Sequence, residues 1–111
     1  MNSTLLKKIK LDTLAGKRAL FVATDCVSLL DAKQKDYGPR NISPFGTKGL
    51  AVRLYDKVER LANLLIDRES APNNESLEDT FKDITNYGII GQLLLKEEWP
   101  ADEPEEFDTF Y

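Results

Sequence analysis

Apolar residues recur every three or four positions along much of this chain, and this repeat constrains the fold more than any other feature. In residues 50–68 it marks one face of a helix, while charged and amide residues mark another. The apolar positions there are Leu50, Leu54, Val58, Leu61 and Leu65. We find no convincing strand, so the pattern predicts an all-α fold.

Two more segments repeat at helical spacing. One runs over residues 17–36 and is stopped by Gly38-Pro39, because Gly favours a helix C-terminus and Pro cannot continue the helix. A shorter helix is expected over residues 4–13, ended or bent by Gly16. The apolar positions of the longer helix are Leu20, Ala23, Val27 and Leu30, with Cys26 beside them as a core residue.

The last helix is expected from Ser76 to about Glu97. Ser76 and Asp79 have the spacing of a capping box, which predicts Ser76 as the N-cap. Gly88 and Gly91 each cost about 1 kcal/mol relative to Ala inside a helix, which indicates close approach by another helix or chain. This helix has more apolar surface than one face needs, so we expect a three- to four-helix bundle completed by homo-oligomerisation.

Residues 38–49 contain three Gly and two Pro and are expected to form a shaped loop, with Phe45 anchoring it to the core. Within it, Gly46-Thr47-Lys48-Gly49 lacks the spacing of a P-loop. Lys48 is nevertheless a candidate phosphate contact.

The 111 residues include no His and one Cys. This excludes Ser-His-Asp and Cys-His catalysis and zinc-histidine sites, and any metal chemistry must use oxygen ligands such as Mg²⁺ accepts. One Cys allows no internal disulfide, and no apolar run reaches the length of a membrane span. A cytoplasmic location is expected.

Charge is distributed unevenly along the chain. Residues 1–60 hold twelve Lys and Arg against six Asp and Glu, a net charge of +6, whereas residues 97–111 hold seven acids and no base. We therefore expect a single domain over residues 1–99 and an acidic tail over residues 100–111. A basic body suits an anionic partner such as a nucleotide, although a mixed, solvated surface explains the same counts.

Four carboxylates have the spacing of metal ligands. Asp79 and Asp83 are four residues apart on one helix, and Asp56 and Glu59 are three apart on the preceding helix. If the two helices are antiparallel, these pairs form a cage for Mg²⁺, with Asp56 and Asp83 as the candidate catalytic residues. Alternatively, Asp79 is a helix cap, and Asp56 and Glu59 pair with Arg60 and Lys57.

A second set of residues has the chemistry of a nucleotide contact. Lys and Arg bind phosphates, Tyr stacks on a base, and Asn hydrogen-bonds a base edge or ribose. The candidates are Lys33, Lys35, Tyr37, Asn41, Lys48, Arg53 and Arg60. Basic residues at a helix C-terminus are also favoured by the helix dipole alone.

Three motifs resemble a known family. They are Lys35-Asp36-Tyr37-Gly38, residues 53–64 (RLYDKVERLANL) and residues 75–87 (ESLEDTFKDITNY). Over residues 20–96 the chain looks like the phage and bacterial nucleotide modification associated domain, which is itself similar to the MazG-like all-α nucleotide pyrophosphohydrolases. The resemblance implies a MazG-like all-α fold in which one acidic pair on each of two helices holds Mg²⁺. It also implies an enzyme that cleaves a nucleoside triphosphate between the α- and β-phosphates.

Three functions follow from these patterns. The first is Mg²⁺-assisted hydrolysis of a nucleotide phosphoanhydride. The second is a non-catalytic sponge that holds a nucleotide signal and counters host antiviral defence. The third is a protein-interaction module that acts through the acidic tail.

Overall fold

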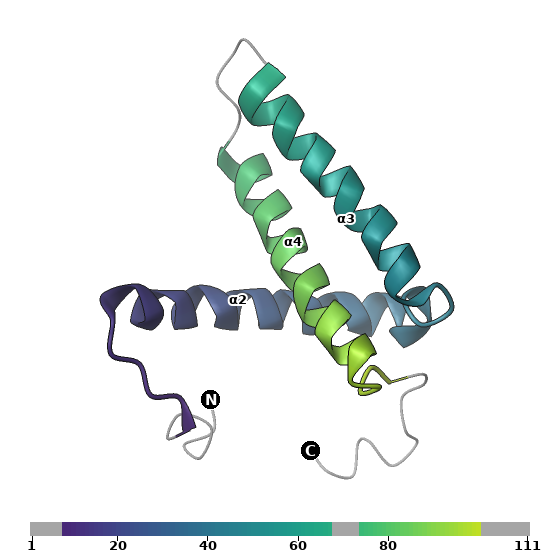
Figure 1. Cartoon of the computed structure of the whole chain (residues 1–111), viewed down its shortest axis with the longest axis horizontal. Helices are drawn as coiled ribbons and strands as arrows, with labels where there is room; N and C mark the ends of the chain where they lie inside the picture. The colour runs from purple at the N-terminus through teal and green to yellow at the C-terminus, as the bar shows by residue number, and fades with distance from the viewer. Residues whose placement is uncertain (1–7, 68–73, 101–111) are drawn as a thin grey trace.

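The computed structural model describes residues 8–67 and 74–100, and every regular element in them is helical (Figure 1). The elements are α2 (Leu14–Tyr37), a 3-10 turn (Pro39–Asn41), α3 (Gly46–Ala62), a π-helical turn (Asn63–Asp67) and α4 (Asn74–Leu95). The described residues contain no strand, which confirms the predicted all-α class. The acidic residues 101–111 lie outside the described part.

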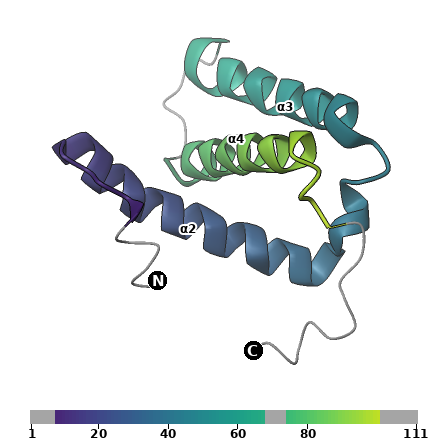
Figure 2. The ribbon, with the colours of Figure 1, turned by 60° about the horizontal axis from the view of Figure 1, so that its bottom comes forward.

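Helix α4 is the central element. It packs against α3 along one side and against α2 on the other, and in Figure 2 it lies between them. α3 and α4 form an antiparallel hairpin, and α2 crosses it at an angle with its N-terminal half extending beyond the hairpin (Figure 1). None of the helices in residues 8–67 and 74–100 has the length and hydropathy needed to cross a bilayer.

The start of α2 differs from the expectation. Residues 9–12 are not helical, Thr13 is the N-cap of α2, and its side-chain oxygen accepts a hydrogen bond from the Gly16 amide at 3.0 Å. Gly16 therefore lies in the first turn of a helix instead of ending one, because this bond satisfies an amide that the first turn would leave unpaired. Residues 4–7 of the expected short helix lie outside the described residues.

The end of α2 is as predicted. Gly38 has φ 73° and ψ 164°, a conformation that only Gly adopts without strain, and its amide donates to the Gln34 carbonyl at 2.8 Å. The chain then turns through Pro39–Asn41 and enters α3 at Gly46, so Lys48 lies in the first turn of α3 instead of in a loop.

Phe45 does not anchor this turn. Its side chain is 68% exposed, whereas Ile42 is 3% exposed and forms the core with Leu50 and Ile90. The turn is also tied to the end of the described chain, because the Trp99 indole N–H donates to the Pro39 carbonyl at 3.1 Å. Position in the turn, not side-chain size, thus decides which residue is buried.

The predicted apolar faces are only partly buried. Cys26 is buried as predicted, but Val27 and Val58 are each more than half exposed. At the C-terminal end of α3, Leu65 is exposed and its neighbour Leu64 is buried. These two residues lie in the π-helical turn, whose wider backbone shifts the register that a regular helix predicts.

Helix α4 begins earlier than expected and uses one of its glycines as predicted. It starts at Asn74, so Ser76 lies inside the first turn rather than at the N-cap, and its carbonyl accepts from the Thr80 hydroxyl at 2.7 Å. A Cβ on Gly91 would lie 3.2 Å from Leu50 Cδ2, which confirms a close helix approach there. At Gly88 no described atom beyond its own helical turn lies within 4 Å of that position, so no described helix approaches Gly88 closely, and approach by a second chain stays a prediction.

Candidate functional site

A pocket of about 430 Å³ lies where the three helices and the 3-10 turn meet. We call it the central pocket. It is lined by Leu30, Lys33, Gln34, Tyr37, Asn41, Ile42, Arg53, Lys57, Asp83, Asn86, Tyr87 and Ile90. The three cations and one carboxylate in this lining give it a net charge of +2, so it favours an anion.

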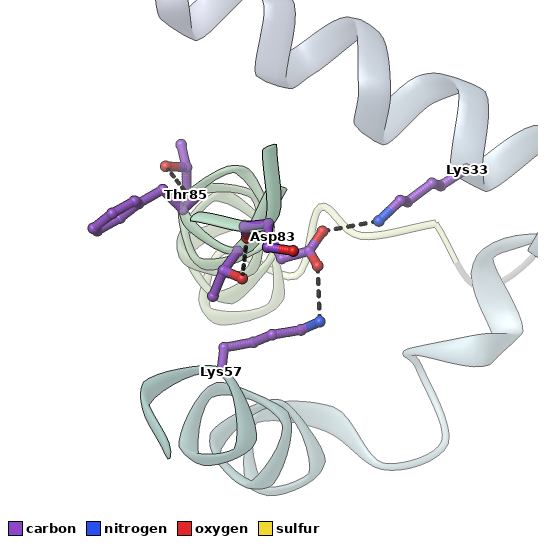
Figure 3. Close-up of polar contacts among 7 residues, drawn as sticks. Lys33, Lys57, Asp83 and Thr85 are labelled. Atoms are coloured by element: carbon purple, nitrogen blue, oxygen red, sulfur yellow. Dashed lines mark hydrogen bonds and ion pairs between the residues drawn. The ribbon is translucent and has the colours of Figure 1, made fainter. Parts of the chain in front are cut away.

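An ion-pair cluster joins the three helices at the central pocket. Lys33 Nζ of α2 lies 2.8 Å from Asp83 Oδ1 of α4, and Lys57 Nζ of α3 lies 2.8 Å from Asp83 Oδ2 (Figure 3). The Asp83 side chain is 17% exposed, so these bonds are partly shielded from water. Two ammonium groups from different helices therefore converge on one carboxylate.

This cluster shifts two pKa values. Burial raises the pKa of the Asp83 carboxyl, but the hydrogen bonds from Lys33 and Lys57 together outweigh it and leave the pKa below its ordinary value. The hydrogen bond to Asp83 raises the pKa of Lys33 despite the opposing effect of burial. Asp83 and Lys33 are thus both charged at neutral pH.

Apolar and aromatic side chains form another part of the lining. Ile42 and Ile90 belong to the buried core, and Leu30 and Tyr87 pack against it. Tyr37 also lines the pocket but is 66% exposed. Its ring is free to stack on a planar ligand that enters from solvent.

Three amides complete the lining. Arg53 Nη2 donates to the Asn41 carbonyl at 2.8 Å, and Gln34 Nε2 lies 3.5 Å from Asn41 Oδ1. Gln34 Oε1 and Asn86 Oδ1 are buried and have no hydrogen-bond partner among the described residues. The pocket therefore contains both cationic donors and open acceptors.

Two further hollows adjoin the central pocket. One, of about 350 Å³, is lined by Leu29, Lys33, Lys57, Arg60, Asp79, Thr80 and Asp83. The other, of about 440 Å³, is lined by Arg53, Asp56, Lys57, Arg60 and Tyr87. Lys57 lines all three hollows, so it lies where they meet.

The structure brings together most of the cations and polar groups predicted from the sequence. Lys33, Tyr37, Asn41 and Arg53 line the central pocket, and Arg60 lines both adjoining hollows. Lys35 and Lys48 line none of these three hollows. Lys35 instead lies 3.5 Å from Asp31 on the same helix.

The four candidate metal ligands are not brought together. Asp79 and Asp83 line one adjoining hollow, Asp56 lines the other, and Glu59 is exposed on α3. In the described part of the chain, no three Cys, Asp or Glu side chains converge closely enough to hold a metal ion. Both oxygens of Asp83 are also held by lysines, so this arrangement does not fit a four-carboxylate cage, and the Mg²⁺ site stays a prediction.

Besides apolar residues, sequence reasoning missed four residues of the central pocket that carry polar groups, namely Gln34, Lys57, Asn86 and Tyr87. Lys57 could have been predicted from the sequence. It is four residues after Arg53 and three before Arg60, so it shares their helix face. Asn86 is an amide on α4 that is only 6% exposed. A buried amide of this kind needs a hydrogen-bond partner. The burial is seen only in the structure, so the sequence alone could not identify this residue.

Comparison of the chain with models of protein families, with curated proteins and with solved structures finds no match. The function is therefore argued from the pocket alone.

Proposed function

We propose that this protein binds a nucleotide in the central pocket. The observation that carries this proposal is the convergence of Lys33 and Lys57 on one site from two helices, with Arg53 in the same lining. Phosphate oxygens are the ligands that such paired cations favour. Here the Asp83 carboxylate is the anion that the two lysines share.

The other half of the pocket suits a base. Tyr37 offers an exposed ring for stacking, and Leu30 and Ile90 provide apolar contact beside it. Stacking on an aromatic side chain contributes about 1–3 kcal/mol per base. Cations and an aromatic group in one pocket match a ligand with both phosphate and base.

Binding without hydrolysis is the function that this geometry supports best. The candidate catalytic residues Asp56 and Asp83 line different adjoining hollows, and Asp83 is neutralised by two lysines. A MazG-like hydrolase requires its carboxylates to hold Mg²⁺ together. Sponge-like retention needs only the cations, the ring and the pocket.

The test is incubation of the full chain with the nucleoside triphosphates, with and without Mg²⁺, followed by denaturation and chromatography. Intact nucleotide recovered from the protein supports binding. Release of pyrophosphate that depends on Mg²⁺ supports the hydrolase and contradicts our proposal. Absence of any retained or cleaved nucleotide contradicts both functions.

Two variants of pocket residues and one control variant sharpen this test. Lys57→Met removes the cation at the junction of the hollows and should weaken binding about tenfold or more, whereas Lys48→Met, outside the hollows, should leave binding unchanged. Asp83→Asn raises the pocket charge from +2 to +3 and should strengthen binding of a phosphate several-fold. A hydrolase that uses Asp83 for metal would instead lose turnover in this variant.

We also propose that the chain forms a homo-oligomer. Leu14, Phe21 and Val22 recur at helical spacing on the part of α2 that extends beyond the hairpin, and each is at least 61% exposed. On α3, Val52 and Tyr55 are each 65% exposed. A second copy is the partner that would cover these surfaces in the isolated protein.

A further inference from the structure

Two hydrogen-bond acceptors in the central pocket lack a donor. Gln34 Oε1 on α2 and Asn86 Oδ1 on α4 are both buried, and neither has a partner among the described residues. Asn86 is 6% exposed, so bulk water does not replace that partner. Because buried polar groups in folded proteins are nearly always hydrogen-bonded, two open acceptors in one pocket point to a donor supplied from outside the chain.

The orientation of Gln34 is set by its own neighbour. Its Nε2 lies 3.5 Å from Asn41 Oδ1, so its Oε1 is the atom left open. The Asn41 backbone carbonyl is in turn occupied by Arg53 Nη2 at 2.8 Å. Both Asn41 oxygens therefore already have a partner within the pocket wall. The acceptors without a donor are Gln34 Oε1 and Asn86 Oδ1.

None of the charged donors of the pocket is bonded to these two amide oxygens. Lys33 and Lys57 both hold Asp83 at 2.8 Å, and Arg53 holds the Asn41 carbonyl. A phosphate satisfies cations but offers the two amide oxygens nothing, because it carries acceptors. The missing donors must therefore come from the base or the ribose, and of these groups only an exocyclic amine carries two N–H donors on one nitrogen.

We propose that the central pocket selects a base with an exocyclic amine, namely adenine, cytosine or guanine, whose amine N–H groups donate to Asn86 Oδ1 and Gln34 Oε1. This inference rests on the proposed nucleotide function and deepens it. A base without the amine leaves at least one buried acceptor unpaired. Sites built to hydrogen-bond a ligand group reject the analogue that lacks it far more strongly than apolar pockets reject a change of size.

The experiment is calorimetric titration of the full chain, in EDTA, with three matched pairs of 5′-triphosphates. The pairs are adenosine with purine riboside, cytidine with 2-pyrimidinone riboside, and guanosine with inosine, and each pair differs by the amine alone. We expect the amine-bearing member of at least one pair to bind about tenfold or more tightly. Equal affinities within all three pairs overturn this inference but leave nucleotide binding intact, whereas no binding by any of the six overturns the proposed function itself.

Variants then assign the preference to the two amides. Gln34→Met and Asn86→Leu retain approximate side-chain size and remove the acceptor, so each should reduce the affinity ratio within the preferred pair several-fold. Gln92→Met is the matched control, because Gln92 is an exposed amide of α4 that lines none of the three hollows. An unchanged ratio in both pocket variants overturns the assignment. If Asn86→Leu fails to fold, the wild-type pairs and Gln34→Met still decide the question.

Discussion

Asp83 is the residue that links the three helices and that holds the two lysines of the proposed phosphate site. It is partly shielded from water, and its two oxygens hold cations from α2 and α3 at 2.8 Å. Removing one partner from such a cluster leaves the charges of the remaining groups without a full counter-charge. The same cluster fixes the positions of the two lysines that a phosphate would meet.

The stability that Asp83 contributes should depend on pH. Its pKa is lowered in the folded state, so its contribution is present above the unfolded value of about 3.9 and is lost as the pH falls through the lower folded value. The pKa of Lys33 is raised, so its contribution is present below its ordinary 10.5 and is lost as the pH rises through the higher folded value. Asp83→Asn should therefore reduce the free energy of unfolding by about 1 kcal/mol near neutral pH, because Lys33 and Lys57 are partly exposed and water screens the pairs.

Urea denaturation of the wild type and Asp83→Asn from pH 2 to pH 8 tests this expectation. The difference in unfolding free energy should shrink as the pH falls below about 4, because the carboxyl is protonated first in the unfolded state and only at lower pH in the folded state. A difference that stays constant to pH 2 would show that Asp83 stabilises the fold by packing rather than by charge.

Tyr37 provides a second test at the scale of a residue. Because its ring is 66% exposed, Tyr37→Ala should cost little stability, but it should weaken nucleotide binding by about 1–3 kcal/mol through lost stacking. Tyr55→Ala is the control, since Tyr55 is 65% exposed and lines none of the three hollows. Calorimetric titration that gives equal affinities for the two variants would remove Tyr37 from the site.

At the scale of the elements, the apolar repeat predicts which segments are helical but not how each helix is covered. The repeat identifies α2, α3 and α4, and Gly38 ends α2 as expected. It fails at Val27 and Val58, which are half exposed, because burial depends on whether a second helix lies opposite.

The residues of the candidate site were likewise only partly predictable from the sequence. Lys33, Tyr37 and Asn41 are close in sequence and were predicted together, whereas Lys57 and Asn86 join them only through the packing of α4 against both α2 and α3. Helical spacing places residues on a face, but the meeting of three faces is a property of the tertiary structure. Spacing on α3 and α4 alone also predicted a carboxylate cage that the described side chains do not form.

The two glycines of α4 form a matched pair for testing helix packing. Gly88→Ala should raise the free energy of unfolding by about 0.5–1 kcal/mol, because the methyl group meets no described atom and Ala favours the helix. Gly91→Ala gains the same propensity but places its methyl group 3.2 Å from Leu50, which is 5% exposed and has little room to move. Urea denaturation at one protein concentration should therefore rank Gly88→Ala above Gly91→Ala, and equal gains would contradict the close approach of α3 and α4.

At the scale of the whole molecule, one copy of the chain is less compact than a typical domain of its length. Its radius of gyration is 16.5 Å, whereas a compact chain of this length has a radius of about 13 Å. Apart from Pro39, five apolar residues are buried among those described, while larger side chains on α2 and α3 remain exposed. The long helix α2 extends beyond the α3–α4 hairpin (Figure 1).

This shape leads to a prediction about assembly. Phe21 is 74% exposed in the middle of the apolar stripe on α2, so Phe21→Asp places a charge where a second copy would pack. Sedimentation velocity should show the wild type as a dimer or larger and the variant shifted toward a single chain. Phe45→Asp is the control, because Phe45 is equally accessible at 68% but lies in the turn before α3, away from that stripe. A wild type that sediments as a single chain would contradict the oligomer. Dissociation by both variants would mean that the interface does not lie on α2 alone, and that the turn beside the central pocket is also covered by the second copy.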